Sequence, residues 1–278
     1  MHRKIEKARR YWSWRLKSTA NLPLFWHVGR PNFGDDINPS FLERLSDQQV
    51  RFATNRSQPH LLGVGSILES ATPSSIVIGS GYLKPDSGPL PKQTRVVSVR
   101  GQRSLELAGC GDHVLLGDPL VLVDQLFDKP IRKKHEIGLV SHVLNISAMK
   151  AKYGRYTHLI SPMQSPWRVV EEIASCERIV SQSLHGLIVA DALQIPNLWL
   201  APSDSMAGGR FKFDDYFSTL DQEKPFFAAN EDIFQHPSQY PFMIGQFKYS
   251  KQQYRTAISN ACASLSLATN RVEVGVSV

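Results

Sequence analysis

Cysteine is scarce in this sequence and gives no sign of a metal site or a disulfide framework. The three cysteines, Cys110, Cys176 and Cys262, lie far apart in 278 residues, and none belongs to a CxxC pair. Zinc sites and disulfide-stapled folds need closely spaced or more numerous cysteines. Each of the three lies in or beside an apolar stretch, so we expect buried free thiols and no metal site.

Long apolar runs and a dinucleotide fingerprint are also missing. No stretch approaches the roughly 20 apolar residues of a transmembrane helix, and the N-terminus lacks the apolar core of a secretory signal. We therefore expect an intracellular protein. The glycine-rich turns GVGS (63–66) and GSGY (79–82) do not fit GxGxxG, which argues against an NAD-dependent enzyme.

Basic charge is concentrated at one end of the chain. The net charge is +7, and residues 1–18 hold seven arginines and lysines against one glutamate, so the rest of the chain is nearly neutral. No recognised nucleic-acid module follows, and we expect no nucleic-acid partner. Tyr11, Trp12 and Trp14 leave two interpretations open: a basic helix that lies on an anionic membrane surface, or a solvated helix whose aromatic rings pack on the body.

Short apolar strands alternate with helical patterns along most of the chain. Strands are expected at 24–28, 61–67, 75–80, 95–100, 113–117, 136–143, 157–161, 178–183 and 197–201. Helices are expected at 37–46, 102–110, 165–176, 184–194, 211–220 and 250–268. This alternation predicts an α/β fold with two Rossmann-like halves whose parallel sheets face a cleft.

A polar stretch with a proline, residues 123–136, is typical of a linker between the two halves. The predicted organisation is a basic segment, an N-terminal α/β domain, a C-terminal α/β domain, and a tail whose helix packs back on the body. Their bounds are 1–18, 19–125, 137–222 and 223–278. Ligands of parallel sheets bind at the carboxyl ends of the strands, so the turns there are the candidates for a site.

Turns in the first half carry three kinds of candidate group. Asp35 and Asp36 open a helix, where one of them can cap backbone N–H groups and the other is left to bind a hydroxyl or take a proton. Arg100 ends a strand, where a guanidinium can hold a phosphate or carboxylate, or can pair with a nearby acid. Asp118 precedes a proline and is a candidate turn former.

The second half offers two histidines and a cationic loop. His142 ends the first strand of this half, and His185 falls in the first turn of a helix that Ser183 can cap. A histidine there can donate a proton near neutral pH, although a lone histidine on an apolar helix is also a common structural residue. Arg210 and Lys212 follow two glycines, in a loop that either closes over an anionic ligand or forms surface salt bridges.

Taken in order, these motifs resemble the polysaccharide pyruvyl transferases. The similar stretches are NFGDD, SVRGQRS with the following GDP, SQSLHGLIVADALQIP and KFDDYF, spread over residues 24–220. The resemblance implies a two-domain GT-B-like fold and transfer of pyruvate from phosphoenolpyruvate to two hydroxyls of a sugar, which forms a cyclic ketal. Members often have arginine where this chain has Ser183, and we expect Arg210 or Lys212 to replace that cation.

The resemblance also assigns roles. His185 would donate a proton to the methylene carbon of phosphoenolpyruvate, and Asp35 or Asp36 would orient or deprotonate the attacking hydroxyl. Because this donor carries two anionic groups, it needs fixed cations and no metal or further cofactor. The expected donor-binding residues are Arg100, His142, Ser183, Arg210 and Lys212. The expected acceptor-binding residues are Asn32, Gly65 and Ser66.

Bacterial members of the family often modify lipid-linked saccharides at the inner face of the cytoplasmic membrane. The resemblance therefore implies a peripheral protein of exopolysaccharide biosynthesis, held at that face through residues 1–18 and acting on such an acceptor. Two other functions stay open: a sugar-nucleotide glycosyltransferase on the same architecture, and a non-catalytic scaffold of a polysaccharide assembly complex.

Overall fold

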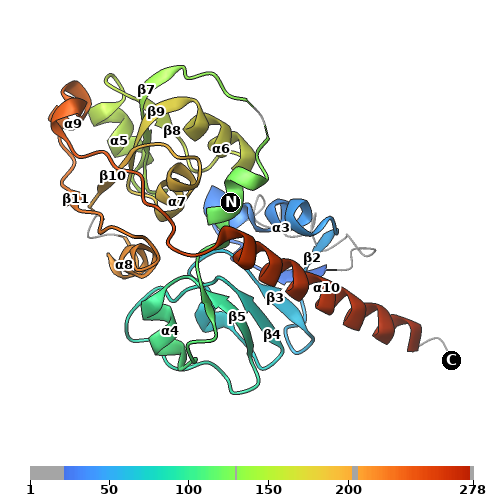
Figure 1. Cartoon of the computed structure of the whole chain (residues 1–278). Helices are drawn as coiled ribbons and strands as arrows, with labels where there is room; N and C mark the ends of the chain where they lie inside the picture. The colour runs from blue at the N-terminus through green and yellow to red at the C-terminus, as the bar shows by residue number, and fades with distance from the viewer. Residues whose placement is uncertain (1–21, 129, 202–205, 276–278) are drawn as a thin grey trace, which may run out of the picture.

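The computed structural model describes residues 22–128, 130–201 and 206–275, with the side chains of the last helix described up to residue 268. The predicted basic segment at 1–18 lies outside the described residues. The chain folds into two parallel sheets with helices packed against them (Figure 1), which confirms the predicted α/β fold. No helix in the described part of the chain is long and apolar enough to cross a bilayer.

The first sheet contains six described strands in the order β2–β1–β3–β4–β5–β6, and every pair is parallel. The strands are β1 (Leu22–Phe25), β2 (Val50–Phe52), β3 (His60–Leu62), β4 (Ser75–Ile78), β5 (Arg95–Val99) and β6 (Leu115–Leu116). The helical elements of this half are α2 (Phe33–Asp36), α3 (Asn38–Ser46), η1 (Leu68–Ser70), α4 (Gln102–Ala108) and η2 (Pro119–Gln125). Strand β2 is absent from the sequence prediction because its three residues, VRF, place an arginine between two apolar residues and form no apolar run.

The second sheet has five described strands in the order β11–β10–β9–β7–β8, again all parallel. The strands are β7 (His135–Val140), β8 (His158–Ile160), β9 (Cys176–Ser181), β10 (Asn197–Leu200) and β11 (Phe226–Phe227). The helical elements are α5 (Ile146–Tyr153), α6 (Pro166–Ala174), α7 (Leu184–Ala192), α8 (Phe211–Phe217), α9 (Asp232–Gln235) and η3 (Pro237–Gln239).

The chain after residue 222 touches both sheets. β11 adds an edge strand beside β10 of the second sheet. The helix expected at 250–268 is α10 (Lys251–Gly275), which returns to the first half and contacts α3, β1, β4, β5 and η2. Figure 1 shows this red helix running along the first half toward the C-terminus.

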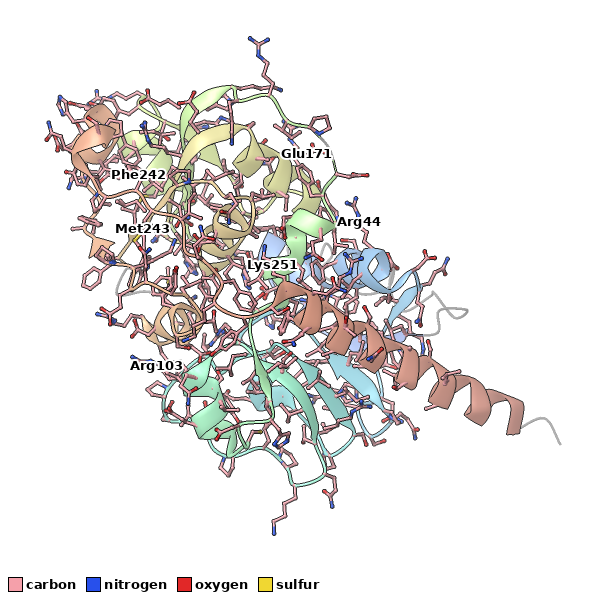
Figure 2. All side chains as sticks on the ribbon, viewed as in Figure 1. Arg44, Arg103, Glu171, Phe242, Met243 and Lys251 are labelled. Carbon is pink, nitrogen blue, oxygen red and sulfur yellow. The ribbon has the colours of Figure 1, made fainter. Side chains whose placement is uncertain are left out.

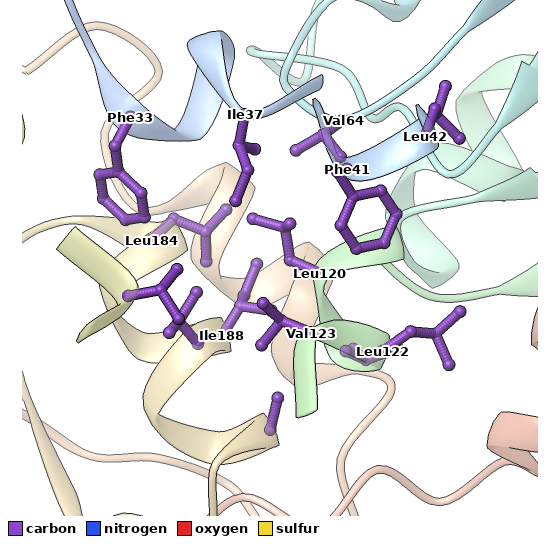
Figure 3. Close-up of a cluster of buried hydrophobic side chains, with 14 of the residues drawn as sticks. Phe33, Ile37, Phe41, Leu42, Val64, Leu120, Leu122, Val123, Leu184 and Ile188 are labelled. Atoms are coloured by element: carbon purple, nitrogen blue, oxygen red, sulfur yellow. The ribbon is translucent and has the colours of Figure 1, made fainter. Parts of the chain in front are cut away.

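Apolar side chains join the two halves into one continuous core. Phe33 and Ile37 from the first half face Leu184 and Ile188 of α7, and Leu120 of η2 lies between them (Figure 3). All five are buried. Because each such side chain contributes about 1.5–3 kcal/mol when it leaves water, packing fixes how the two sheets face each other.

Tyr254 of α10 packs at the carboxyl ends of β4, β5 and β6. Its hydroxyl donates to the Gly117 carbonyl and accepts from Ser98 Oγ at 3.3 Å. A Cβ at Gly79 would lie 2.7 Å from that hydroxyl, so the glycine of the GSGY turn makes room for the tyrosine. This flank of the first sheet is therefore closed by the protein itself.

All three cysteines are free thiols, as expected. Cys176 and Cys262 are buried, whereas Cys110, in the turn after α4, is half-buried. The expectation of three buried thiols is thus wrong at Cys110.

Candidate active site

A cavity of about 350 Å³ lies where the carboxyl ends of the two sheets meet. The residues that line it follow β1, β3 and β4 of the first half and β7, β8, β9 and β10 of the second. The polar side chains that line it are His27, Asn32, Asp35, Ser66, Ser141, His142, Ser183, His185 and Lys212. This is the position at which parallel sheets bind ligands.

His185 lies in the wall of this cavity as the second residue of α7. Ser183 caps the helix, because its Oγ accepts a hydrogen bond of 3.4 Å from the Gly186 N–H. The imidazole packs edge-on against Phe33 of the other half, with ring centroids 6.2 Å apart. Its Nε2 is buried and has no hydrogen-bond partner among the described residues. Because such an atom is costly to leave unpaired, it is placed to meet a ligand.

The protonation of His185 depends on what occupies the cavity. Its pKa is lowered to about 3, first by burial and then by the nearby cations Lys212 and Arg100. The ring is therefore neutral at pH 7 when the cavity is empty. An anion bound beside it would offset the cations and raise the pKa, so a proton-donor role for His185 requires an anionic ligand.

The two aspartates of the NFGDD motif have different environments. Asp36 Oδ2 accepts the backbone N–H of Asn32 at 3.1 Å, which ties down the start of α2. Asp35 lines the cavity, and its Oδ2 accepts from Asn32 Nδ2 at 2.9 Å. Burial raises the pKa of Asp35, while the nearby His27 and the Asn32 hydrogen bond lower it. Of the two aspartates, Asp35 is therefore the one that is placed to contact a ligand.

Two of the three predicted acceptor-binding residues, Asn32 and Gly65, lie beside Asp35. Asn32 lines the cavity and bonds to Asp35, as described above. Gly65 has φ +119°, and a Cβ there would lie 3.4 Å from Asp35 Oδ1. Ser66 also lines the cavity, although its Oγ accepts a hydrogen bond of 2.7 Å from Arg100 Nη1.

Arg100 is not placed as its predicted donor-binding role requires. Its side chain is 1% exposed and does not line the cavity. Nε donates to Asp215 Oδ2 at 2.9 Å, Nη1 to Ser66, and Nη2 to the Tyr82 carbonyl at 2.5 Å. Because its guanidinium already donates hydrogen bonds to protein atoms, Arg100 holds α8 against the first half and is not placed to bind a ligand directly.

Arg210 and Lys212, the two candidate replacement cations, lie apart. Arg210 is 57% exposed, pairs with Asp214 at 3.1 Å and stacks near Trp199, away from the cavity. Lys212 lines the cavity and forms no ion pair with any described residue. Its pKa is lowered to about 8, by burial and by Arg100, so the ammonium remains mostly charged at pH 7. Among the described residues that line the cavity, Lys212 is the one lysine or arginine.

The remaining polar wall combines one predicted residue with two that the sequence analysis missed. His142, a predicted donor-binding residue, lines the cavity, and its pKa is lowered to about 4 by burial and by Lys212 and Arg30. His27 and Ser141 also line it. Both lie inside strands predicted at 24–28 and 136–143, but they follow β1 and β7, which end earlier. The strand-end rule that selected His142 was therefore the signal that could have found them.

A second groove, of about 480 Å³, lies between α3, α6 and α10. Its wall contains Arg44 and Glu171, labelled on one side of the molecule in Figure 2, and Trp167, on which the Arg44 guanidinium stacks at 3.7 Å. None of the buried, unpartnered polar atoms lies in this groove, whereas two lie in the first cavity. Within the described ranges, no three His, Cys, Asp or Glu side chains are grouped to hold a metal ion.

The fold and the cavity define an α/β protein with a small cationic site between two parallel sheets. Residues 76–204, which include β4 through β10, match the polysaccharide pyruvyl transferase family. This match and the relative described next confirm the resemblance seen in the motifs. Through this segment, the chain resembles the polysaccharide pyruvyl transferases.

Two curated proteins illustrate the range of relatives. The succinoglycan biosynthesis protein ExoV of Rhizobium meliloti (strain 1021) is 31% identical over 211 residues, which cover 71% of this chain and 64% of ExoV. The chain thus spans less than two thirds of ExoV. An uncharacterized protein of Acanthamoeba polyphaga mimivirus is 27% identical over 223 residues, or 72% of this chain and 75% of that protein.

One solved structure also resembles the fold. It is the crystal structure of a functionally uncharacterized protein from Klebsiella pneumoniae, with a TM-score of 0.45 and 13% identity. The superposition covers 82% of this chain and all of that chain.

Proposed function

We propose that this protein transfers the pyruvyl group of phosphoenolpyruvate to two hydroxyls of a sugar in an exopolysaccharide repeat unit. The products are a cyclic ketal and phosphate. The family match and the similarity to a succinoglycan biosynthesis protein support pyruvyl transfer in exopolysaccharide synthesis. The observation that carries the proposal is one small cavity that holds Lys212, the unpartnered His185 Nε2 and the carboxylate of Asp35.

The proton balance of this reaction matches these groups. The methylene carbon of phosphoenolpyruvate gains one proton, and two sugar hydroxyls lose one each. The second hydroxyl proton leaves with the phosphate. The site therefore needs an acid beside the methylene carbon and a base beside the first hydroxyl, and no redox partner.

His185 is the proposed acid. The anionic donor, once bound beside Lys212, raises the pKa of the imidazole from its low value in the empty cavity, so that the ring takes up a proton. Transfer of this proton to the methylene carbon makes the neighbouring carbon cation-like and open to attack. Donor binding thus protonates His185, whereas the ring is neutral in the empty enzyme.

Asp35 is the proposed base. It comes from the opposite half of the molecule to His185 and shares the cavity with it. Asn32 Nδ2 holds one carboxylate oxygen at 2.9 Å, which leaves the other for a sugar hydroxyl. His27 also lines the cavity, and its charge lowers the pKa of Asp35, which favours the carboxylate that a base requires.

The acceptor and its location belong to the same proposal. We expect a lipid-linked oligosaccharide or polysaccharide at the inner face of the cytoplasmic membrane. The basic segment at residues 1–18 would bring the protein to that surface through anionic lipid. Deletion of residues 1–18 should weaken cosedimentation with anionic liposomes and leave activity on a soluble acceptor unchanged.

A sugar-nucleotide donor fits the cavity less well. The cavity volume of about 350 Å³ is near the lower end of the range for ligand pockets, about 300–1,000 Å³. Tyr254 covers the strand ends of the first half at Gly79 and Gly117. Asp35 is the one carboxylate that lines the cavity in the described part of the chain, and the proposal uses it as the base.

The test is incubation of the full chain with phosphoenolpyruvate and a panel of lipid-linked saccharides. The proposal predicts that one acceptor gains the mass of a pyruvate ketal and that an equal amount of phosphate is released. Release of a nucleoside diphosphate from a sugar nucleotide would instead identify a glycosyltransferase. A His185→Ala variant that still supports ketal formation in cells would point to a scaffold.

A further inference from the structure

We infer that Ser141, the N-terminus of α7 and Lys212 form the subsite for the donor's phosphate group. This assignment rests on the proposed function, because it names which part of phosphoenolpyruvate binds at which wall of the cavity. It also adds Ser141, which follows β7, to the residues that bind the ligand.

Ser141 is the first observation. Its side chain is 0% exposed, it lines the cavity, and its Oγ has no hydrogen-bond partner among the described residues. A hydroxyl withdrawn from water without a partner destabilises a folded protein. Such a group is explained when a ligand supplies the missing hydrogen bond.

The N-terminus of α7 is the second observation. β7 and β9 are neighbours, and the Gln182 N–H donates to the Val140 carbonyl at 3.0 Å. The residue after Val140 is Ser141, so its position is next to the turn that starts α7. The cap of Ser183 Oγ reaches only the Gly186 N–H. The preceding N–H groups of Leu184 and His185 are therefore left for a ligand.

These groups together suit a phosphate. The backbone N–H groups at a helix N-terminus and a serine hydroxyl donate hydrogen bonds, and an ammonium supplies charge, which is the combination that phosphate-binding loops use. Lys212 lines the same cavity and makes no ion pair with a described carboxylate. With the phosphate held at the α7 terminus, the rest of the donor lies beside the His185 ring, whose Nε2 is also unpartnered.

The experiment measures binding of inorganic phosphate to the full chain by calorimetry in a phosphate-free buffer, with phosphoenolpyruvate as competitor. Ser141→Ala removes the hydroxyl. We expect its dissociation constant for phosphate to rise about tenfold or more, because a hydrogen bond to a charged group is lost. Its unfolding temperature should stay the same or rise, since an unpartnered buried hydroxyl is removed. The KM for phosphoenolpyruvate should rise more than kcat falls.

Ser175→Ala is the matched control. Ser175 is also buried, but its Oγ donates to the Glu172 carbonyl at 2.7 Å, and it lies outside the cavity. This variant should lose stability and keep its affinity for phosphate. The opposite pattern in the two serines is what separates a ligand group from a structural hydroxyl.

The outcomes are distinct from those of the transfer assay. If Ser141→Ala binds phosphate as tightly as the unaltered chain, or if the unaltered chain turns over phosphoenolpyruvate but phosphate does not compete, the subsite is overturned and the proposed function stands. If phosphate binds through Ser141 but no pyruvyl transfer occurs, the subsite stands and the proposed function fails.

Discussion

The imidazole of His185 rests directly on Gly34. A Cβ at position 34 would lie 2.6 Å from His185 Cε1 and closer still to Nδ1. The glycine belongs to α2 of the first half and the histidine to α7 of the second. The proposed acid is therefore held in place by the absence of a side chain on the facing domain.

Replacement of Gly34 by alanine should displace the His185 ring. Because a shift of about 1 Å in a catalytic group can cost roughly 100-fold in rate, we expect kcat to fall by about that factor. Gly88→Ala is the control, since a Cβ there meets no atom within 4 Å. Steady-state kinetics with thermal unfolding of both variants checks this. An alanine at position 34 that leaves kcat unchanged would show that the ring position does not matter.

The two aspartates of α2 should respond differently. Asp35→Asn removes the proposed base, and kcat should fall by about 10²–10⁴. Asp36→Ala removes the acceptor of the Asn32 N–H, so it should lower the free energy of unfolding by about 1 kcal/mol and leave kcat nearly unchanged. Rate assays and urea unfolding separate the two effects. Equal rate losses in both variants would count against Asp35 as the base.

Lys212 and Arg210 provide a matched pair of cations two residues apart. Lys212→Met removes the cation that lines the cavity, and kcat/KM for phosphoenolpyruvate should fall by about 10- to 100-fold. Arg210→Gln should change it by less than about twofold, because Arg210 is exposed and paired with Asp214. A larger loss at Arg210 than at Lys212 would reverse the assignment of the donor's cation.

Arg100 should matter for stability. It forms a buried pair with Asp215, and Arg100→Met leaves that carboxylate without its cation, at a cost of about 3–5 kcal/mol in unfolding free energy. Arg155→Met breaks an exposed pair with Glu231 and should cost less than about 1 kcal/mol. Denaturant titration compares them. An Arg100→Met variant that is as stable as the unaltered chain but binds the donor poorly would show that Arg100 binds the donor.

Local patterns were enough to predict most of the strands and the turns at their ends, but they missed β2 and β11. His142, His185 and Asp35 all follow or lie near predicted strands, and parallel sheets bring such positions to one edge. The same rule applied to His27 and Ser141 would have added both. The choice between Asp35 and Asp36 needed the structure, because either residue can cap a helix start.

The ion-pair partners of Arg100 and Arg210 could not be predicted from the sequence. An arginine at a strand end suits an anion in general, but its partner here is Asp215, more than a hundred residues away. Arg210 and Lys212 read as one cationic stretch in the sequence, but Arg210 precedes α8 and pairs with Asp214, whereas Lys212 lies in α8 and lines the cavity. Long-range pairing of this kind has no local signature.

The central claim is that donor binding gives His185 its proton. Calorimetry of phosphoenolpyruvate binding at pH 7, in buffers with different ionisation enthalpies, counts the protons taken up. The pKa of His185 is about 3 when the cavity is empty. A rise of this pKa above 7 on binding therefore means that the ring takes up a proton. The unaltered chain should take up about one proton more than His185→Gln. Equal counts for the two proteins would contradict the account.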